Sequence, residues 1–186
     1  MVSDVLDEAD LQIRNARLAD AEILAAAQRA IARTPGRLAS TPDEIHEASF
    51  RERIARLAGG DRGAFVVATR RAPSGETLVG HAILDPLKLA VTAHVVDLTL
   101  AVHEGYQRKG IGRFLLSHLI TWARSSPHVY RVELRVRSVN YPAIELYKKM
   151  GFMMEGRMIN RIQLSPNQYC DDLVMGLWVG PPRDSG

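Results

Sequence analysis

YQRKGIG, residues 106–112, joins an apolar run to a long amphipathic segment and combines two glycines with two basic side chains. A helix that begins near Gly110 leaves its first backbone N–H groups without partners, and such groups attract anions. Glycine has no Cβ, so a phosphate can approach the backbone closely. Arg108, Lys109 and Arg113 add positive charge. Taken alone, the stretch fits a diphosphate-binding turn or a tight strand-to-helix turn with solvated cations.

The segments on either side of this turn predict a strand–helix–strand unit. Residues 93–102 form an apolar run, residues 110–126 space apolar side chains at helical intervals, and residues 130–137 alternate apolar and polar side chains. Because a helix connects them, the two strands should be parallel, with a right-handed crossover. One side of this helix should carry Phe114, Leu115, Leu119 and Trp122.

The rest of the chain shows the same kinds of pattern. Further strands are predicted at 11–17, 64–70, 78–89, 152–164 and 171–179. Further helices are predicted at 21–33, 42–58 and 141–150. Asp20 should cap the first of these helices. Thr41 should cap the second, with Pro42 in its first turn and Glu44 three residues after the cap. Residues 71–77 should form a turn. This order predicts an α/β fold of the α+β type, with a central mixed, twisted sheet flanked by helices.

Length and composition indicate one globular domain. A chain of 186 residues fits a single domain, which we place at 11–180 with flexible termini at 1–10 and 181–186. The net charge of +3 favours an anionic ligand, but no block of like charges suggests nucleic acid. The single cysteine, Cys170, excludes an internal disulfide and a cysteine zinc cluster. No signal peptide or membrane-spanning stretch is present, so we expect a cytoplasmic protein without metal, nucleic-acid or membrane partners.

Two motifs carry a family resemblance. QRKGIG (107–112) fits the pattern Gln/Arg-x-x-Gly-x-Gly/Ala, which resembles the acetyl-CoA loop of the GCN5-related N-acetyltransferase (GNAT) family. VRSVNYPAIELYKKMGF (136–152) resembles the second signature of the family, an Asn followed by Ala and then Leu-Tyr-x-x-x-Gly-Phe. The resemblance covers roughly 64–179, and the preceding strand and helices are in family order. A Rossmann site lacks its third glycine here, and a Walker loop lacks its Gly-Lys-Ser/Thr.

The resemblance implies acetyl-CoA as co-substrate, lying in a V-shaped gap between the strands 93–102 and 130–137. Backbone groups of the first strand would pair with the pantetheine arm as an added strand does, and an N–H near Leu100 would stabilise the oxyanion. On position alone, Asn140 equally fits a helix cap. The implied cofactor contacts are Leu100, Ala101, Val102, Gln107, Arg108, Lys109, Gly110, Ile111, Gly112, Arg113, Asn140 and Tyr147.

The resemblance also implies catalytic roles. Tyr147 matches the tyrosine that protonates the departing thiolate, although a helix position with this spacing also fits a core tyrosine. Many relatives that act on peptide termini have a Glu where this chain has Arg135. We therefore expect Asp97 as the base, with Glu133 second, while both also fit ordinary strand ion pairs. His94 is the weaker third candidate and fits a structural histidine.

The expected acceptor is a primary amine of a small molecule or of a peptide or protein N-terminus. The helices 21–33 and 42–58 and the last two strands should form its side of the site, with 34–45 as a mobile lid and 165–169 as a further contact. Negative charge for a cationic amine could come from Glu44, Glu47, Glu155, Asp171 and Asp172.

Two questions stay open at this point. An alternative function is a catalytically inactive CoA-binding sensor or interaction module with the same fold, which Arg135 motivates and Tyr147 disfavours. The sequence does not set the oligomeric state, with a homodimer among the options.

Overall fold

The computed structural model describes residues 10–72 and 75–181 of the chain. Within these residues, seven strands form one mixed sheet in the order β1-β2-β3-β4-β5-β7-β6, and β4 with β5 is the one parallel pair. The strands are β1 Leu11–Asn15, β2 Ala64–Ala72, β3 Gly75–Pro86, β4 Val95–Val102, β5 Arg131–Arg137, β6 Met153–Ser165 and β7 Gln168–Trp178. The mixed sheet and the parallel strands around the glycine turn confirm the predicted fold class.

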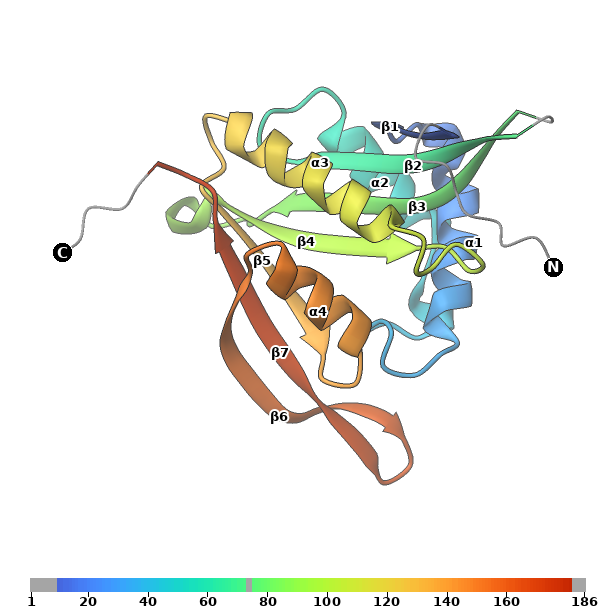
Figure 1. Ribbon diagram of the computed structural model, residues 1–186, viewed down its shortest axis with the longest axis vertical. Helices are drawn as coiled ribbons and strands as arrows, with labels where there is room; N and C mark the ends of the chain where they lie inside the picture. The colour runs from blue at the N-terminus through green and yellow to red at the C-terminus, as the bar shows by residue number, and fades with distance from the viewer. Residues whose placement is uncertain (1–9, 73–74, 182–186) are drawn as a thin grey trace.

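Helices cover both faces of the sheet (Figure 1). α3 (Ile111–Ser125) and α4 (Tyr141–Lys149) pack on one face, where Leu115 and Leu116 are fully buried. α1 (Ala21–Ala32) and α2 (Glu47–Leu57) cover the other face, where they enclose side chains such as Phe65 of β2. Two apolar clusters therefore lie on opposite sides of one sheet, as the alternation of side chains along strands requires.

β4 and β5 begin as neighbours and then separate. Residues 95–97 of β4 pair with 131–133 of β5, and no later pairing joins the two strands in the described chain. Beyond this point β4 is bonded to β3, and β5 is bonded to β7. The two strands visibly diverge in Figure 1. The gap places one edge of β4 beside an opening in the middle of the sheet, as the family resemblance implies.

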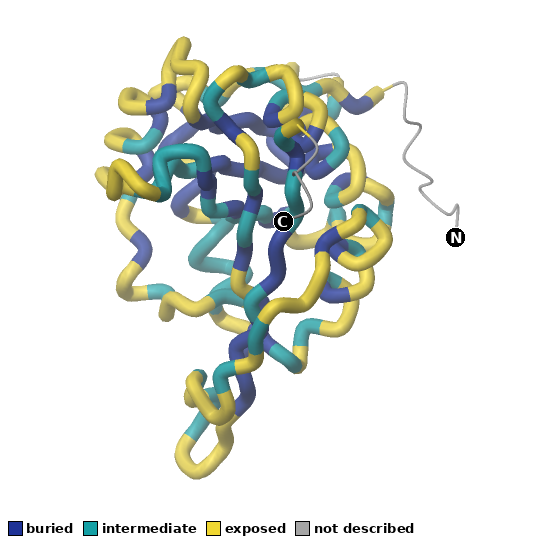
Figure 2. The backbone as a smooth tube through the Cα atoms, turned by 90° about the vertical axis from the view of Figure 1, so that its left-hand side faces the viewer, coloured by how far each residue is buried: buried dark blue, intermediate teal, exposed yellow. Residues whose placement is uncertain are grey.

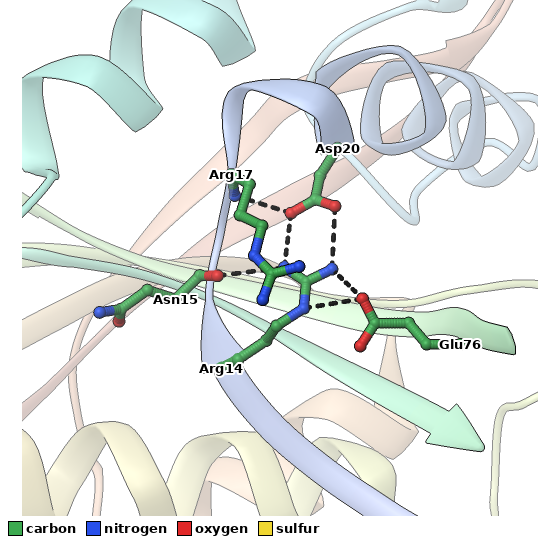
Figure 3. A network of polar contacts seen from close by, with 5 residues as sticks. All are labelled: Arg14, Asn15, Arg17, Asp20 and Glu76. Carbon is green, nitrogen blue, oxygen red and sulfur yellow. Dashed lines mark hydrogen bonds and ion pairs between the residues drawn. The ribbon is translucent and has the colours of Figure 1, made fainter.

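Arg14 ties β1 to the start of α1 and to β3 (Figure 3). Its guanidinium donates to both carboxylate oxygens of Asp20, at 2.7 and 2.9 Å, and pairs with Glu76. The Arg17 N–H donates to the same Asp20 carboxylate at 2.7 Å. The predicted side-chain cap is wrong, since Asp20 makes no capping bond to α1. Its oxygens instead stabilise the short 3-10 helix η2 (Leu18–Asp20) that precedes α1.

The predicted helix 42–58 is two separate elements. The capping box of Thr41 and Glu44 is present, but it starts the short 3-10 helix η3 (Pro42–Glu44). Ile45 is extended and buried, and α2 begins only at Glu47. A capping box fixes where a helical turn begins and not how long it continues. The apolar spacing of α2 itself is as predicted, with Phe50, Ile54 and Leu57 buried.

The predicted apolar face of α3 is correct in part. Leu115 and Leu119 are buried, while Phe114 is 37% exposed. The face that packs on the sheet is shifted and includes Ile111 and Leu116 instead. The turn predicted at 71–77 is shorter, because β2 extends to Ala72 and β3 begins at Gly75.

The β6–β7 hairpin extends below the main body, and its tip is mostly exposed (Figure 2). The strands 152–164 and 171–179 are confirmed with small shifts of their ends. In the described ranges, no helix has the length and apolar character that crossing a bilayer requires. The expected flexible termini lie largely outside the described residues, as do residues 73–74 of the predicted turn.

Candidate functional site

A cleft of about 910 Å³ follows the divergence of β4 and β5. Its walls come from α1 and the loop 34–40, Arg53 of α2, the second half of β4, the turn before α3, the end of β5, α4, and positions 161, 162 and 172 of the hairpin. Ligand sites commonly enclose roughly 300–1,000 Å³. The cleft is therefore large enough for an extended ligand, and elements from both faces of the sheet line it.

The turn before α3 has the backbone of an anion site. Arg108 and Gly110 both have left-handed φ angles, of 62° and 82°. Gly110 is the N-cap of α3, which begins at Ile111. The first N–H groups of a helix have no helical acceptor, and the helix dipole gives that end a partial positive charge. The turn therefore presents N–H donors to one end of the cleft, where an oxyanion can accept them.

Most of the turn side chains predicted to bind the cofactor line this end of the cleft. Two do not: the Lys109 ammonium lies over the Tyr106 ring at 5.8 Å from its centroid, and Ile111 is 1% exposed in the core. Neither residue is part of the cleft lining. Those that line the cleft are Gln107, Arg108, Gly110, Gly112 and Arg113.

The end of β4 forms the central wall. Leu100, Ala101 and Val102 all line the cleft, as predicted. A Cβ on Gly112 would lie 3.1 Å from Leu146 Cδ2 and within 4 Å of Leu100 and Val102. Gly112 therefore allows the start of α3 to pack closely against these side chains of β4 and α4. In the described chain no strand pairs with β4 on this side, so its backbone groups can accept an extended ligand as an added strand.

Asn140 and Tyr147 lie on the opposite wall. Asn140 is the N-cap residue of α4, but its side chain makes no capping bond; its Oδ1 accepts from Arg37 Nη1 at 3.1 Å. Tyr147 lines the cleft and is 7% exposed, and its ring lies 5.7 Å from that of Phe152. Burial raises the pKa of the Tyr147 phenol to about 12. Tyr147 is thus both a core residue and a protonated hydroxyl beside the cleft.

The three base candidates occupy different places. Asp97 lines the cleft, and burial raises the pKa of its carboxyl. Glu133 is its register partner on β5 but does not line the cleft, and it pairs with Arg131 at 3.4 Å. His94 lies away from the cleft, among the rings of Tyr130 and Trp178. Of the three, Asp97 alone has access to a ligand in the cleft.

A chain of buried hydrogen bonds leads from the core to the cleft. His103 Nδ1 lies 2.9 Å from the Leu78 carbonyl, so it must carry a proton and donate it. His103 Nε2 is 3.1 Å from His81 Nδ1, and His81 Nε2 is 3.1 Å from the side-chain amide of Gln28. Burial lowers the pKa of both imidazoles, that of His81 to about 3, so both are neutral.

Neutral rings leave one proton arrangement that satisfies all three contacts. His103 accepts at Nε2, so His81 donates from Nδ1 and accepts at Nε2. The structure places Gln28 Oε1 at 3.1 Å from His81 Nε2, and this proton arrangement requires the amide to be turned so that its NH₂ group faces His81 instead. Gln28 lines the cleft, so its amide orientation there is fixed by two histidines in the core.

The side of the cleft away from the turn is rich in arginine, which overturns the predicted acidic acceptor side. Glu44 accepts from Thr41, Glu47 pairs with Arg51, Glu155 with Arg131 and Asp171 with Arg157, and none of these four carboxylates lines the cleft. Asp172 does line it, but is held by Arg137 at 3.2 Å. The loop 165–169 is not part of the lining either. The lining arginines on this side are Arg37, Arg53, Arg135, Arg137 and Arg161.

Several lining residues were not anticipated from the sequence. Gln28 lies in a helix without any motif, and Arg53 lies on the polar side of α2. Alternation along β5 could have indicated that Arg135 and Arg137 share the face of Glu133. The loop 34–40, in the segment predicted as a lid, does line the cleft.

Comparison with known proteins gives a consistent result. The model of the family described as "Acetyltransferase (GNAT) family" matches residues 29–152 of this chain. L-amino acid N-acetyltransferase AaaT of Escherichia coli is 34% identical over 98 residues, which are 53% of this chain and 60% of that protein. N-alpha-acetyltransferase RimI of Mycobacterium tuberculosis is 39% identical over 85 residues, 46% of this chain and 51% of that protein. The match thus spans about half of each curated relative.

Solved structures match along almost the whole chain. A GNAT-family acetyltransferase from Streptococcus pneumoniae superimposes with a TM-score of 0.80 at 25% identity, covering 90% of this chain and 99% of that one. The acetyltransferase yncA of Salmonella typhimurium, solved with its cofactor acetyl-CoA, gives a TM-score of 0.77 at 21% identity, covering 95% and 98%. The fold is therefore shared over nearly the full length of these structures.

Proposed function

This chain belongs to the Acetyltransferase (GNAT) family, and on that premise we propose that it transfers the acetyl group of acetyl-CoA to a primary amine. The observation that carries the proposal is the cleft itself, where an unpaired edge of β4 meets an anion-binding helix start. The acceptor is an amine of a small molecule or of a peptide N-terminus, in line with the activities named for AaaT and RimI.

Acetyl-CoA fits the residues of the cleft. The first N–H groups of α3, with Arg108 and Arg113, would hold the diphosphate. Backbone groups of β4 at 100–102 would hydrogen-bond the pantetheine arm, and an N–H near Leu100 would stabilise the developing oxyanion. The Asn140 amide would bond the same arm after exchanging its contact with Arg37.

Tyr147 would assist the departure of the thiolate. Its phenol, with a pKa of about 12, stays protonated at neutral pH. Proton transfer from this phenol to a thiolate, whose thiol has a pKa of about 8.5, is unfavourable. The two pKa values differ by roughly 3.5, which corresponds to about 5 kcal/mol. Its main contribution would therefore be a hydrogen bond that stabilises the thiolate, and water would deliver the proton.

Asp97 would take the proton of the amine through a water relay. It lies three residues before Leu100, or about 10 Å along the strand at roughly 3.3 Å per residue. One or two waters must bridge that distance. Burial raises the pKa of Asp97, which makes it a stronger base than an exposed aspartate.

The test is release of CoA thiol in the presence of a broad panel of amines that includes amino acids, peptides with free N-termini and polyamines. We expect release that depends on both acetyl-CoA and one class of amine. Tight binding of acetyl-CoA without release for any amine would favour the alternative, a CoA-binding module without turnover.

A further inference from the structure

The acceptor side of the cleft carries an excess of positive charge. Apart from the turn 103–113, the lining includes five arginines and two carboxylates, a formal excess of three positive charges. Arg137 and Asp172 neutralise one another at 3.2 Å within the wall, and Arg161 approaches the same carboxylate at 3.6 Å. Of the two carboxylates, Asp97 is the one left to offset the charge of the remaining arginines.

Arg135 is the side chain most available to a ligand. It lines the cleft, it is exposed, and no ion pair or side-chain hydrogen bond of its guanidinium occurs in the described residues. Arg135 and Asp97 come from the two strands that diverge. Burial raises the pKa of Asp97, and the charges of Arg135 and Arg53 both oppose this rise, so both arginines act on the same carboxylate. An exposed guanidinium without an ion-pair partner can bind a carboxylate with two parallel hydrogen bonds.

Arg53 reaches the same region from α2. Its nearest carboxylate, Asp85, lies 3.5 Å away and is already held by both terminal nitrogens of Arg56, at 2.8 and 3.1 Å. The Arg53 charge also acts on buried His81, beside Gln28. Arg53 therefore has hydrogen-bonding capacity left that faces the cleft.

We propose that Arg135 and Arg53 form a subsite for a carboxylate on the acceptor, so that the acceptor is an amine that also carries an acidic group, such as a free α-amino acid. The inference rests on the proposed acetyl transfer and narrows its substrate class. Asp97 and Gln28 line the same cleft, where Asp97 would take the proton of the amine through water. A polyamine would instead bring several positive charges into a region that already has an excess of them.

The test compares each L-α-amino acid with its α-carboxamide, a pair of nearly equal shape in which only the acid carries the negative charge. Rates are compared per free amine, because the carboxamide has the lower amine pKa. For wild-type protein, we expect a kcat/KM at least about tenfold higher for the acid, or about 1.4 kcal/mol of preference. Arg135→Gln should raise KM for the acid by about tenfold or more, leave the carboxamide within about twofold, and keep acetyl-CoA affinity unchanged. Arg53→Gln should act in the same direction.

The control is Arg51→Gln, which removes an exposed arginine of α2 that pairs with Glu47 outside the cleft. Its preference for the acid should equal that of the wild type. Equal use of acid and carboxamide by wild-type protein would contradict the subsite and leave the acetyl transfer intact. A loss of acetyl-CoA affinity in Arg135→Gln without a change in acid preference would assign the arginine to the cofactor.

A binding measurement tests the carboxylate subsite separately from the acetyl transfer. If no amine is acetylated, the proposed function is wrong, and calorimetry of amino acids on the CoA-loaded protein then decides the subsite alone. Binding that is at least about tenfold weaker in Arg135→Gln supports the subsite; equal or undetectable binding in both proteins overturns it.

Discussion

Single side chains in the cleft serve structure and chemistry at once. Tyr147 packs against Phe152 in the core and also lines the cleft. Asp97 is half-buried, so its charged form is disfavoured, which is a cost to folding and an advantage for a base. Such positions allow tests in which stability and activity move in different directions.

For Tyr147, the change to Phe keeps the ring and removes the hydroxyl. The ring contacts are unchanged, so stability should fall little. If the hydroxyl stabilises the departing thiolate, kcat should drop by roughly 100-fold while acetyl-CoA affinity holds. Steady-state kinetics with calorimetry measures both. An unchanged kcat would leave Tyr147 as a packing residue only.

For Asp97, the prediction concerns stability as a function of pH. The pKa of Asp97 is raised by burial above its ordinary value of 3.8, so the folded state binds its proton more tightly than the unfolded state. The contribution of Asp97 to the free energy of unfolding is therefore greatest below about pH 3.8, and it is lost as pH rises through the folded pKa. Asp97→Asn should unfold at higher denaturant than wild type at pH 7 and show no advantage near pH 3.5.

The activity of the same variant gives an independent result. Asp97→Asn should turn over more slowly, with the acidic limb of its rate–pH profile moved upward toward the pKa of the amine. A variant with normal stability and an unchanged profile would show that the amine loses its proton to bulk water.

The His81–His103 pair predicts a specific protonation pattern. Both rings should be neutral at neutral pH and carry the proton on Nδ1, because the pKa of each is lowered by burial. Nitrogen-15 shifts of the two rings measure this directly. A titration of either ring near pH 6.5 would contradict the assigned orientation of Gln28.

At the scale of elements, the start of α3 shows two different uses of glycine. Gly110 needs its left-handed φ of 82°, while a Cβ there would meet open space. Gly112 has no such backbone requirement, but a Cβ there would be 3.1 Å from Leu146 Cδ2. One glycine shapes the turn before α3, and the other allows close packing beside the cleft.

Gly112→Val should therefore weaken acetyl-CoA binding by at least about tenfold, or roughly 1.4 kcal/mol. The valine side chain would press on Leu146 and on the end of β4, and would so displace the residues that line the cleft there. Calorimetry on the folded variant is the measurement, and circular dichroism checks the fold. Unchanged affinity would place the cofactor elsewhere.

The sequence predicted elements well where one residue pattern was sufficient. The alternation in β5 and the spacing in α4 gave those elements to within a residue or two. The predictions for Thr41 and Asp20 were wrong, because their capping bonds begin a 3-10 turn instead of the expected helix. Local motifs identify the type of turn, and tertiary packing decides which element follows.

At the scale of the whole molecule, the cleft depends on strands far apart in sequence. The family motifs predicted the cofactor end, because the turn and α4 carry it within short segments. The arginines of the acceptor end come from α2, β5, β6 and the loop after α1, and their convergence could not be read from the sequence. The predicted acidic acceptor side failed for that reason, since the carboxylates were judged without their partners.

The central claim is that the gap between β4 and β5 binds acetyl-CoA, with its diphosphate at the start of α3. Hydrogen–deuterium exchange with and without acetyl-CoA tests this most directly. We expect slower exchange at the amides of 100–102 and 110–113, and no change at the exposed tip of the β6–β7 hairpin. Saturation with acetyl-CoA that leaves both of these segments unprotected, or that protects only other surfaces, would contradict the account.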